Sequence, residues 1–144
     1  TEVWSYCRII FIILVSRDYF QTAHRGHNMS DQRAEIVADK YEIETLQRLY
    51  AKATDKLGMD SAEIREEGRR IYHKIFMPDV QVRTVNTGDD LIAEGPDGWA
   101  SVAETALKDY IGTQHLIGTQ LTEVDGDRGE VESYLNAWHK NPDN

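Results

Sequence analysis

Two histidines, His115 and His139, fall on two runs of alternating residues that flank Asp125-Gly126-Asp127. Alternation on both sides of such a turn sequence is typical of a β-hairpin. A three-residue loop, 126–128, sets His115 opposite His139 and keeps one face apolar or small, whereas a two-residue loop sets charge opposite apolar groups. Because burial selects the register, we predict the three-residue loop and two imidazoles on one covered face.

Two imidazoles that share an apolar space could supply an acid and a base, since histidine titrates near neutral pH. The simpler interpretation is that each is a core residue hydrogen-bonded to its neighbours. A zinc site is disfavoured because such sites take three or four ligands, and the chain has neither His-x-x-x-His nor a cysteine cluster. Gly95-Pro96-Asp97-Gly98 lacks the spacing and the lysine of a phosphate-binding loop, so we expect no metal and no cofactor.

The elements that must position the histidines can be read from periodicity. Apolar spacings of three, four and seven predict a helix from Asp31 to about Leu57, and a second helix is predicted from Ser61 to the stop at Pro78. The period then changes to two, which predicts strands over 80–84 and 91–94 joined by a turn at 88–90. After the break at 95–98, a third helix is predicted from Trp99 to Tyr110, closed by Gly112.

Composition narrows the classes of function. The chain has 144 residues, a hydrophobic fraction of 40% and a net charge of −9, which is typical of one globular domain and disfavours nucleic acid and anionic membrane surfaces as partners. The single cysteine, Cys7, forms no internal disulfide, so a cytoplasmic location is expected. Residues 1–28 hold one short apolar run and carry three arginines; we expect an extension without a role in the fold, followed by one domain over 29–144.

The element order, together with Thr113–Gln120 and the phrases Tyr50–Asp55, Phe76–Val80 and Gly95–Trp99, resembles the SnoaL-like branch of the nuclear transport factor 2-like superfamily. The resemblance implies an α+β fold shaped like a cone, with three helices packed on a curved, mostly antiparallel sheet. The family continues past the second hairpin strand with two further strands. The resemblance therefore implies a truncated sheet in which the strand ending in His139 is an open edge, and an open edge invites pairing with another chain.

The resemblance also implies site residues. Scytalone dehydratase and lindane dehydrochlorinase-type enzymes pair an aspartate at the end of the first helix with a histidine at the start of the long hairpin, and Asp55 and His115 match those positions. A second pocket histidine of scytalone dehydratase matches His139. The two tyrosines with which scytalone dehydratase activates its substrate through water are replaced here by Thr54 and Thr84, so scytalone itself is not expected to be the substrate. The expected substrate-binding residues are Thr54, Thr84, Ile117, Thr119, Leu135 and Ala137.

Two functions follow from these expectations. The first is a cofactor-free lyase or isomerase, such as a dehydratase or cyclase, in which His115 paired with Asp55 removes a proton from a small hydrophobic carbonyl compound while His139 donates a proton or steadies an oxyanion. The second is a non-catalytic module that binds a small ligand or a larger partner subunit, because one fold supports many functions. A homo-oligomer, dimer or trimer, is expected in either case.

Overall fold

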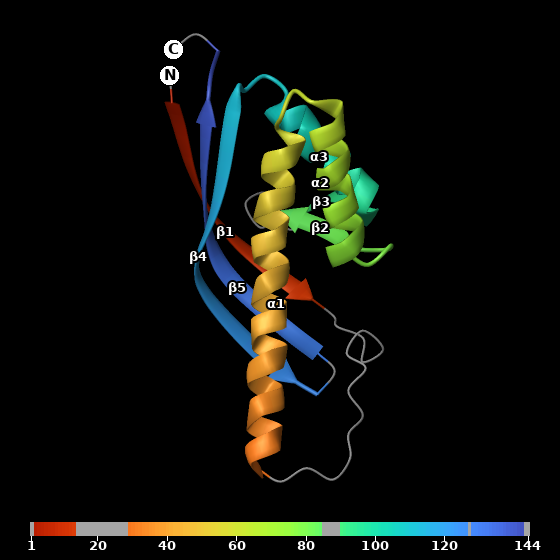
Figure 1. Ribbon diagram of the computed structural model, residues 1–144, viewed down its shortest axis with the longest axis vertical. Coiled ribbons are helices and arrows are strands. Elements are labelled where there is room, and N and C mark those ends of the chain that lie inside the picture. Colours follow the sequence, from red (N-terminus) through yellow and green to blue (C-terminus); the bar gives the residue numbers. More distant parts are fainter. Residues whose placement is uncertain (1, 14–28, 85–89, 127, 143–144) are drawn as a thin grey trace.

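The computed structural model describes residues 2–13, 29–84, 90–126 and 128–142. Within these ranges lie three helices and two antiparallel sheets (Figure 1). The helices are α1 (Met29–Leu57), α2 (Ala62–Ile75) and α3 (Gly95–Leu107). The strands are β1 (Glu2–Ile13), β2 (Gln81–Thr84), β3 (Asp90–Glu94), β4 (Gly112–Asp125) and β5 (Arg128–Lys140). The predicted α+β class is confirmed.

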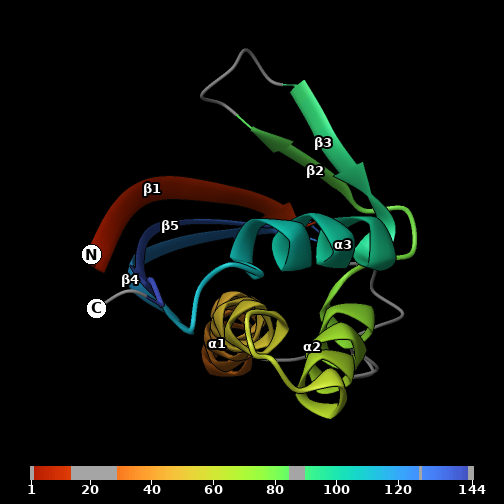
Figure 2. The same ribbon diagram turned by 90° about the horizontal axis from the view of Figure 1, so that it is seen from above.

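The larger sheet has the strand order β1-β5-β4, and α1 runs along its β4 side with α2 beyond (Figures 1 and 2). Every second residue of β5 is buried, from Gly129 through His139, because this face of the sheet lies under the helices. Alternate burial along β5 is what a strand with one covered face requires. The smaller sheet pairs β2 with β3 and extends away from the larger one (Figure 2).

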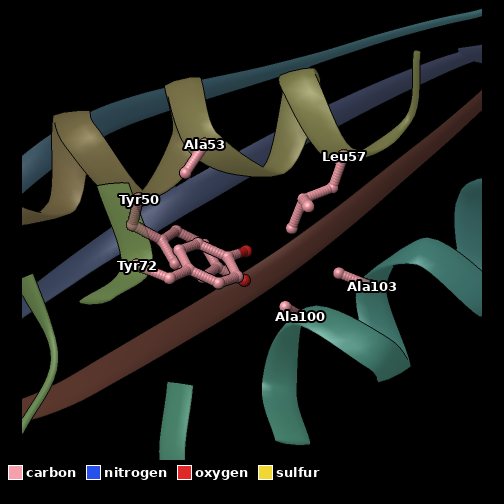
Figure 3. Packing of buried hydrophobic residues seen from close by; sticks show 6 residues of the cluster. All are labelled: Tyr50, Ala53, Leu57, Tyr72, Ala100 and Ala103. Atoms are coloured by element: carbon pink, nitrogen blue, oxygen red, sulfur yellow. The ribbon is translucent and has the colours of Figure 1, made fainter. Parts of the chain in front are cut away.

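The core forms where the three helices meet. The rings of Tyr50 and Tyr72 stack with centroids 5.8 Å apart, and both hydroxyl groups point to the same side, toward Leu57 and α3 (Figure 3). The hydroxyl of Thr54 donates to the Tyr50 carbonyl, so its contact with the Tyr72 hydroxyl, at 2.7 Å, is donated by the tyrosine. The buried cluster comprises Tyr50, Ala53, Leu57, Tyr72, Ala100 and Ala103.

Most helix boundaries follow the sequence signals. Ser61 caps α2 by accepting from the Ile64 N–H, as its position ahead of an apolar period predicts. The third helix differs, because it starts at Gly95 rather than Trp99. Pro96 occupies the first turn, where a missing N–H costs nothing, so the Gly95–Gly98 segment that was expected to break the chain is the beginning of the helix. Residues 88 and 89 of the predicted turn lie outside the described residues.

The amino-terminal segment contributes to the sheet. β1 pairs with β5 in antiparallel register from Glu2 opposite Lys140 to Ile13 opposite Gly129. The expectation that residues 1–28 have no role in the fold is therefore wrong for residues 2–13, and β5 is a central strand rather than an open edge. The physical reason is that an apolar run with β-branched residues satisfies the backbone groups of a neighbouring strand.

Candidate functional site

Asp55 and His115 meet in the interior between the last turns of α1 and the first half of β4. The His115 Nδ1 atom lies 2.8 Å from Asp55 Oδ1, and the exposed fractions of the two side chains are 7% and 31%. A carboxylate only accepts hydrogen bonds, so Nδ1 carries the hydrogen, and in the neutral imidazole Nε2 keeps its lone pair. An imidazole held in one tautomer by a carboxylate is oriented as a general base.

His139, on β5, lies against the same space. Its ring meets the His115 ring edge-on, with centroids 5.5 Å apart and planes at 66°. The ring also stacks on that of Tyr110, with centroids 4.6 Å apart, and its Nδ1 lies 3.0 Å from the hydroxyl of Thr113. If the threonine donates to Nδ1, Nε2 of a neutral His139 carries the hydrogen and is a hydrogen-bond donor.

Burial lowers the pKa of His139, and the neighbouring His115 lowers it further, while the Asp55 carboxylate opposes both. His139 is only 9% exposed, and burial disfavours the charged imidazolium form. His139 is therefore neutral at neutral pH. This protonation state suits a donor that steadies a developing oxyanion and is unsuited to delivery of a full proton.

The hairpin reaches this arrangement by a register that differs from the prediction. The loop has two residues, because Asp125 pairs with Arg128, and the pairs run through Gln120 opposite Ser133. Thr119, at φ 36°, is then an extra residue, and beyond this bulge His115 pairs with Ala137 rather than with His139. The predicted three-residue loop is wrong. Its consequence still holds, because the bulge turns the first half of β4 by one residue and returns His115 to the face of His139.

The remaining predicted residues divide between the interior and other places. Ile117 and its register partner Leu135 lie on the helix-facing side next to Ala137, with Leu135 7% and Ala137 5% exposed. Thr54 is 4% exposed, and its hydroxyl is held between Tyr50 and Tyr72. Thr119 is exposed at the bulge, away from this interior. The side chain of Thr84 lies outside the described residues.

Two neighbours of His139, Thr113 and Tyr110, were not predicted as site residues. Thr113 lies two positions before His115 and so on the same face of β4, a signal that the alternation itself could have provided. Tyr110 follows the end of α3, and its position was interpreted only as part of a helical stripe. Periodicity describes a helix or a strand and does not predict a contact between a residue beyond a helix end and a strand about thirty residues later in the chain.

Other features of the described residues lie apart from this site. A groove between α1 and α2 is lined mainly by cationic side chains and includes none of the predicted site residues; its lining is Lys52, Lys56, Glu67, Arg70, Ile71 and Lys74. In the described ranges, no group of three or more His, Cys, Asp or Glu side chains is placed to hold a metal ion. None of the described helices has the length and apolar character needed to span a membrane.

Comparison with known proteins agrees with this fold. Residues 35–144 match the SnoaL-like domain family, and the chain belongs to that family. A crystal structure from Novosphingobium aromaticivorans DSM 12444, of a protein carrying the provisional name scytalone dehydratase, is similar with a TM-score of 0.56 and 19% sequence identity. The similarity covers 81% of this chain and 68% of that one, and it confirms the nuclear transport factor 2-like fold. No curated protein matches the sequence significantly.

Proposed function

We propose that the protein is a lyase or isomerase of the dehydratase type that acts on a small hydrophobic carbonyl compound by acid-base chemistry alone. The observation that carries the proposal is the hydrogen bond of 2.8 Å from His115 Nδ1 to the Asp55 carboxylate, beside a second, buried imidazole. The family assignment and the scytalone dehydratase name of the similar structure support a dehydration.

The chemistry follows from the protonation states. His115 Nε2 removes a proton from the carbon next to the carbonyl, and Asp55 stabilises the imidazolium that forms. The neutral His139 donates a hydrogen bond to the carbonyl oxygen as negative charge develops there. The β-hydroxyl group then departs with the proton held on His115, so that a carbon–carbon double bond and one water molecule are produced. Apolar Ile117, Leu135 and Ala137 would contact the body of the substrate.

The test uses a β-hydroxy ketone whose dehydration gives a conjugated, ultraviolet-absorbing product. The aldol adduct of benzaldehyde and acetone is suitable, because its product is benzylideneacetone. The full chain should accelerate the elimination, and His115→Ala should lower the rate by about 10²- to 10⁴-fold, the usual contribution of a positioned base. Unchanged elimination in this variant would remove His115 from the mechanism.

The chain offers a matched control. His73 forms a second His–Asp pair, with Nε2 2.9 Å from Asp97 Oδ1, on the exposed surface of α2 and α3. His73→Ala removes an imidazole of the same kind from a place remote from the proposed site and should leave the elimination rate as it is. If ligand binding depends on His115 but no product forms, the non-catalytic module is the correct function.

Two further proposals concern the setting of the protein. We propose a homo-oligomer, dimer or trimer, because the sheet face away from α1 exposes Leu116, Leu121 and Tyr134, which are 50%, 64% and 41% exposed. Sedimentation velocity on the full chain measures this, and a monomer at all concentrations would contradict it. We also propose a cytoplasmic location, which a fluorescent fusion would test.

A further inference from the structure

Two polar side chains in the interior between α1 and the sheet lack partners among the residues that the structure describes. They are the amide nitrogen of Gln47, on α1, and the hydroxyl of Ser133, on β5. Each residue is 1% exposed, so bulk water does not satisfy them. An unpaired buried donor or acceptor disfavours the folded state, and such groups commonly meet a ligand or an ordered water molecule.

The two groups belong to one layer. Ser133 is the register partner of Gln120, so their side chains project from the same face of the sheet. Gln120 reaches α1 from that face, where its amide nitrogen donates to Gln47 Oε1 at 3.0 Å and to the Glu44 carbonyl at 3.1 Å. The amide hydrogens of Gln120 and the amide oxygen of Gln47 are thereby used, whereas the Gln47 amide hydrogens and the Ser133 hydroxyl have no partner among the described residues.

This layer and the His115 site lie along the same face of the sheet and along the same helix, α1. Gln47 precedes Asp55 by two helical turns, a rise of about 12 Å at the usual 1.5 Å per residue. The side chains between the two ends are apolar: Ala51 and Leu135 are buried, and Ile117 is half-buried on the same face of β4. Along this covered face, polar groups at Asp55 and His115 are thus followed by apolar side chains and then by polar groups at Gln47 and Ser133.

We propose that Gln47 and Ser133 bind a polar group at the end of the substrate remote from the reacting carbonyl. The substrate class is then an elongated, largely apolar molecule, such as a substituted aryl ketone, with a hydroxyl or carbonyl oxygen at its far end. The amide hydrogens of Gln47 donate to that oxygen, and the Ser133 hydroxyl donates to it or accepts from it. The orientation of the substrate in this subsite rests on the proposed function of His115.

The experiment compares two ketones that differ by one hydroxyl group. Binding of benzylideneacetone and of para-hydroxybenzylideneacetone to the full chain is measured by calorimetry. The hydroxylated ketone should bind about tenfold more tightly, as expected for a hydrogen bond that satisfies buried groups. Ser133→Ala should abolish most of this preference without weakening binding of the ketone that lacks the hydroxyl. Ser101→Ala, on the exposed face of α3, is the control and should keep the preference.

Thermal unfolding distinguishes a ligand subsite from a buried water molecule. Removal of a hydroxyl that has no partner leaves the melting temperature of the free protein unchanged or raises it, whereas loss of a bridging water lowers it. A lowered melting temperature with no preference between the ketones overturns the subsite, as does equal or absent binding of both ketones to the wild type. If the preference is present but His115→Ala leaves elimination intact, the subsite stands and the proposed function fails.

Discussion

At the residue scale, the proposed mechanism depends on one carboxylate and two imidazoles with different roles. Asp55 fixes the tautomer of His115, and burial keeps His139 neutral. In the proposed mechanism the same residue type thus serves once as a base and once as a donor, because the surroundings differ. Environment rather than residue type assigns acid and base roles in such sites.

Asp55→Asn tests the charge separately from the geometry. The asparagine oxygen can still accept from His115 Nδ1, but the imidazolium that forms during proton removal loses its counter-charge. We expect the elimination rate to fall by about 10²-fold or more, with little change in thermal stability because Asp55 is partly exposed. A rate within a factor of about two of the wild type would contradict a charge-stabilising role.

The lowered pKa of His139 predicts a pH dependence of stability. Below about pH 6.5 the unfolded chain gains a proton at this position before the folded chain does, so the unfolding free energy falls as pH decreases toward the folded pKa and is fully present above pH 6.5. Urea unfolding across this range measures the effect. His139→Gln should flatten the corresponding part of the curve, and an unchanged slope would show that another group titrates there.

The sequence alone identifies the two histidines as candidate site residues but does not identify Asp55. The histidines are found because alternation places them on one covered face of a hairpin. Asp55 is not, because it lies off the apolar stripe of its helix, where an acidic residue is ordinarily solvated, and only the family resemblance singles it out. Thr113 and Tyr110 contact His139. These contacts depend on tertiary packing, which periodicity along the sequence does not predict.

At the scale of elements, the bulge at Thr119 decides which face of β4 meets α1. On one side of it His115 faces the helix, and on the other side Gln120 does. No sequence rule signals the extra residue, since threonine at φ 36° is uncommon. The prediction placed the extra residue in the loop instead of in the strand. It therefore put His115 on the correct face but opposite the wrong residue.

Two deletions test the register at the bulge. Deletion of Thr119 alone removes only the extra residue, so His115 stays opposite Ala137 and elimination activity should be retained. Deletion of both Gly118 and Thr119 shifts the first half of β4 by one position, so His115 turns away from α1 and elimination activity should be lost. An active double-deletion variant would show that this register does not set the site.

Gly68 gives a second test at this scale. In the sequence it weakens the middle of α2; in the fold it lets α2 approach α1, since a Cβ there would lie 2.9 Å from the Ala53 carbonyl oxygen and 3.0 Å from Leu57 Cγ. Gly68→Ala should lower the unfolding free energy by about 1–3 kcal/mol despite the better helix propensity of alanine. Gly98→Ala, whose Cβ would sit 3.8 Å from Ala93 Cβ, should not destabilise. Equal stability of the two variants would contradict close packing at Gly68.

At the scale of the whole molecule, β1 closes one side of the larger sheet. The α+β class and the order of helices and hairpins follow from the periods along the chain. The pairing of β1 does not, because an apolar run of this length fits a strand, a buried helix segment or an unused extension equally well. Which of these forms depends on whether a free strand edge is available, and that is a property of the complete fold.

Removal of residues 1–28 tests the contribution of β1. The shortened chain, beginning at Met29, leaves the backbone groups of β5 without their partners, so we expect lower stability and self-association through the exposed edge. Sedimentation velocity and urea unfolding, compared with the full chain at the same concentration, measure both. A shortened chain with the same unfolding free energy and the same assembly state would show that β1 adds nothing to the fold.

The proposed mechanism requires Asp55 and His115 to act as one unit, and a double-mutant cycle on elimination rate measures whether they do. The rates of wild type, Asp55→Ala, His115→Ala and the double variant are measured under one condition, with His73→Ala as the control. If Asp55 acts only through His115, the double variant is no slower than His115→Ala alone. Independent losses, in which the double variant falls by the product of the two single effects, would contradict the account.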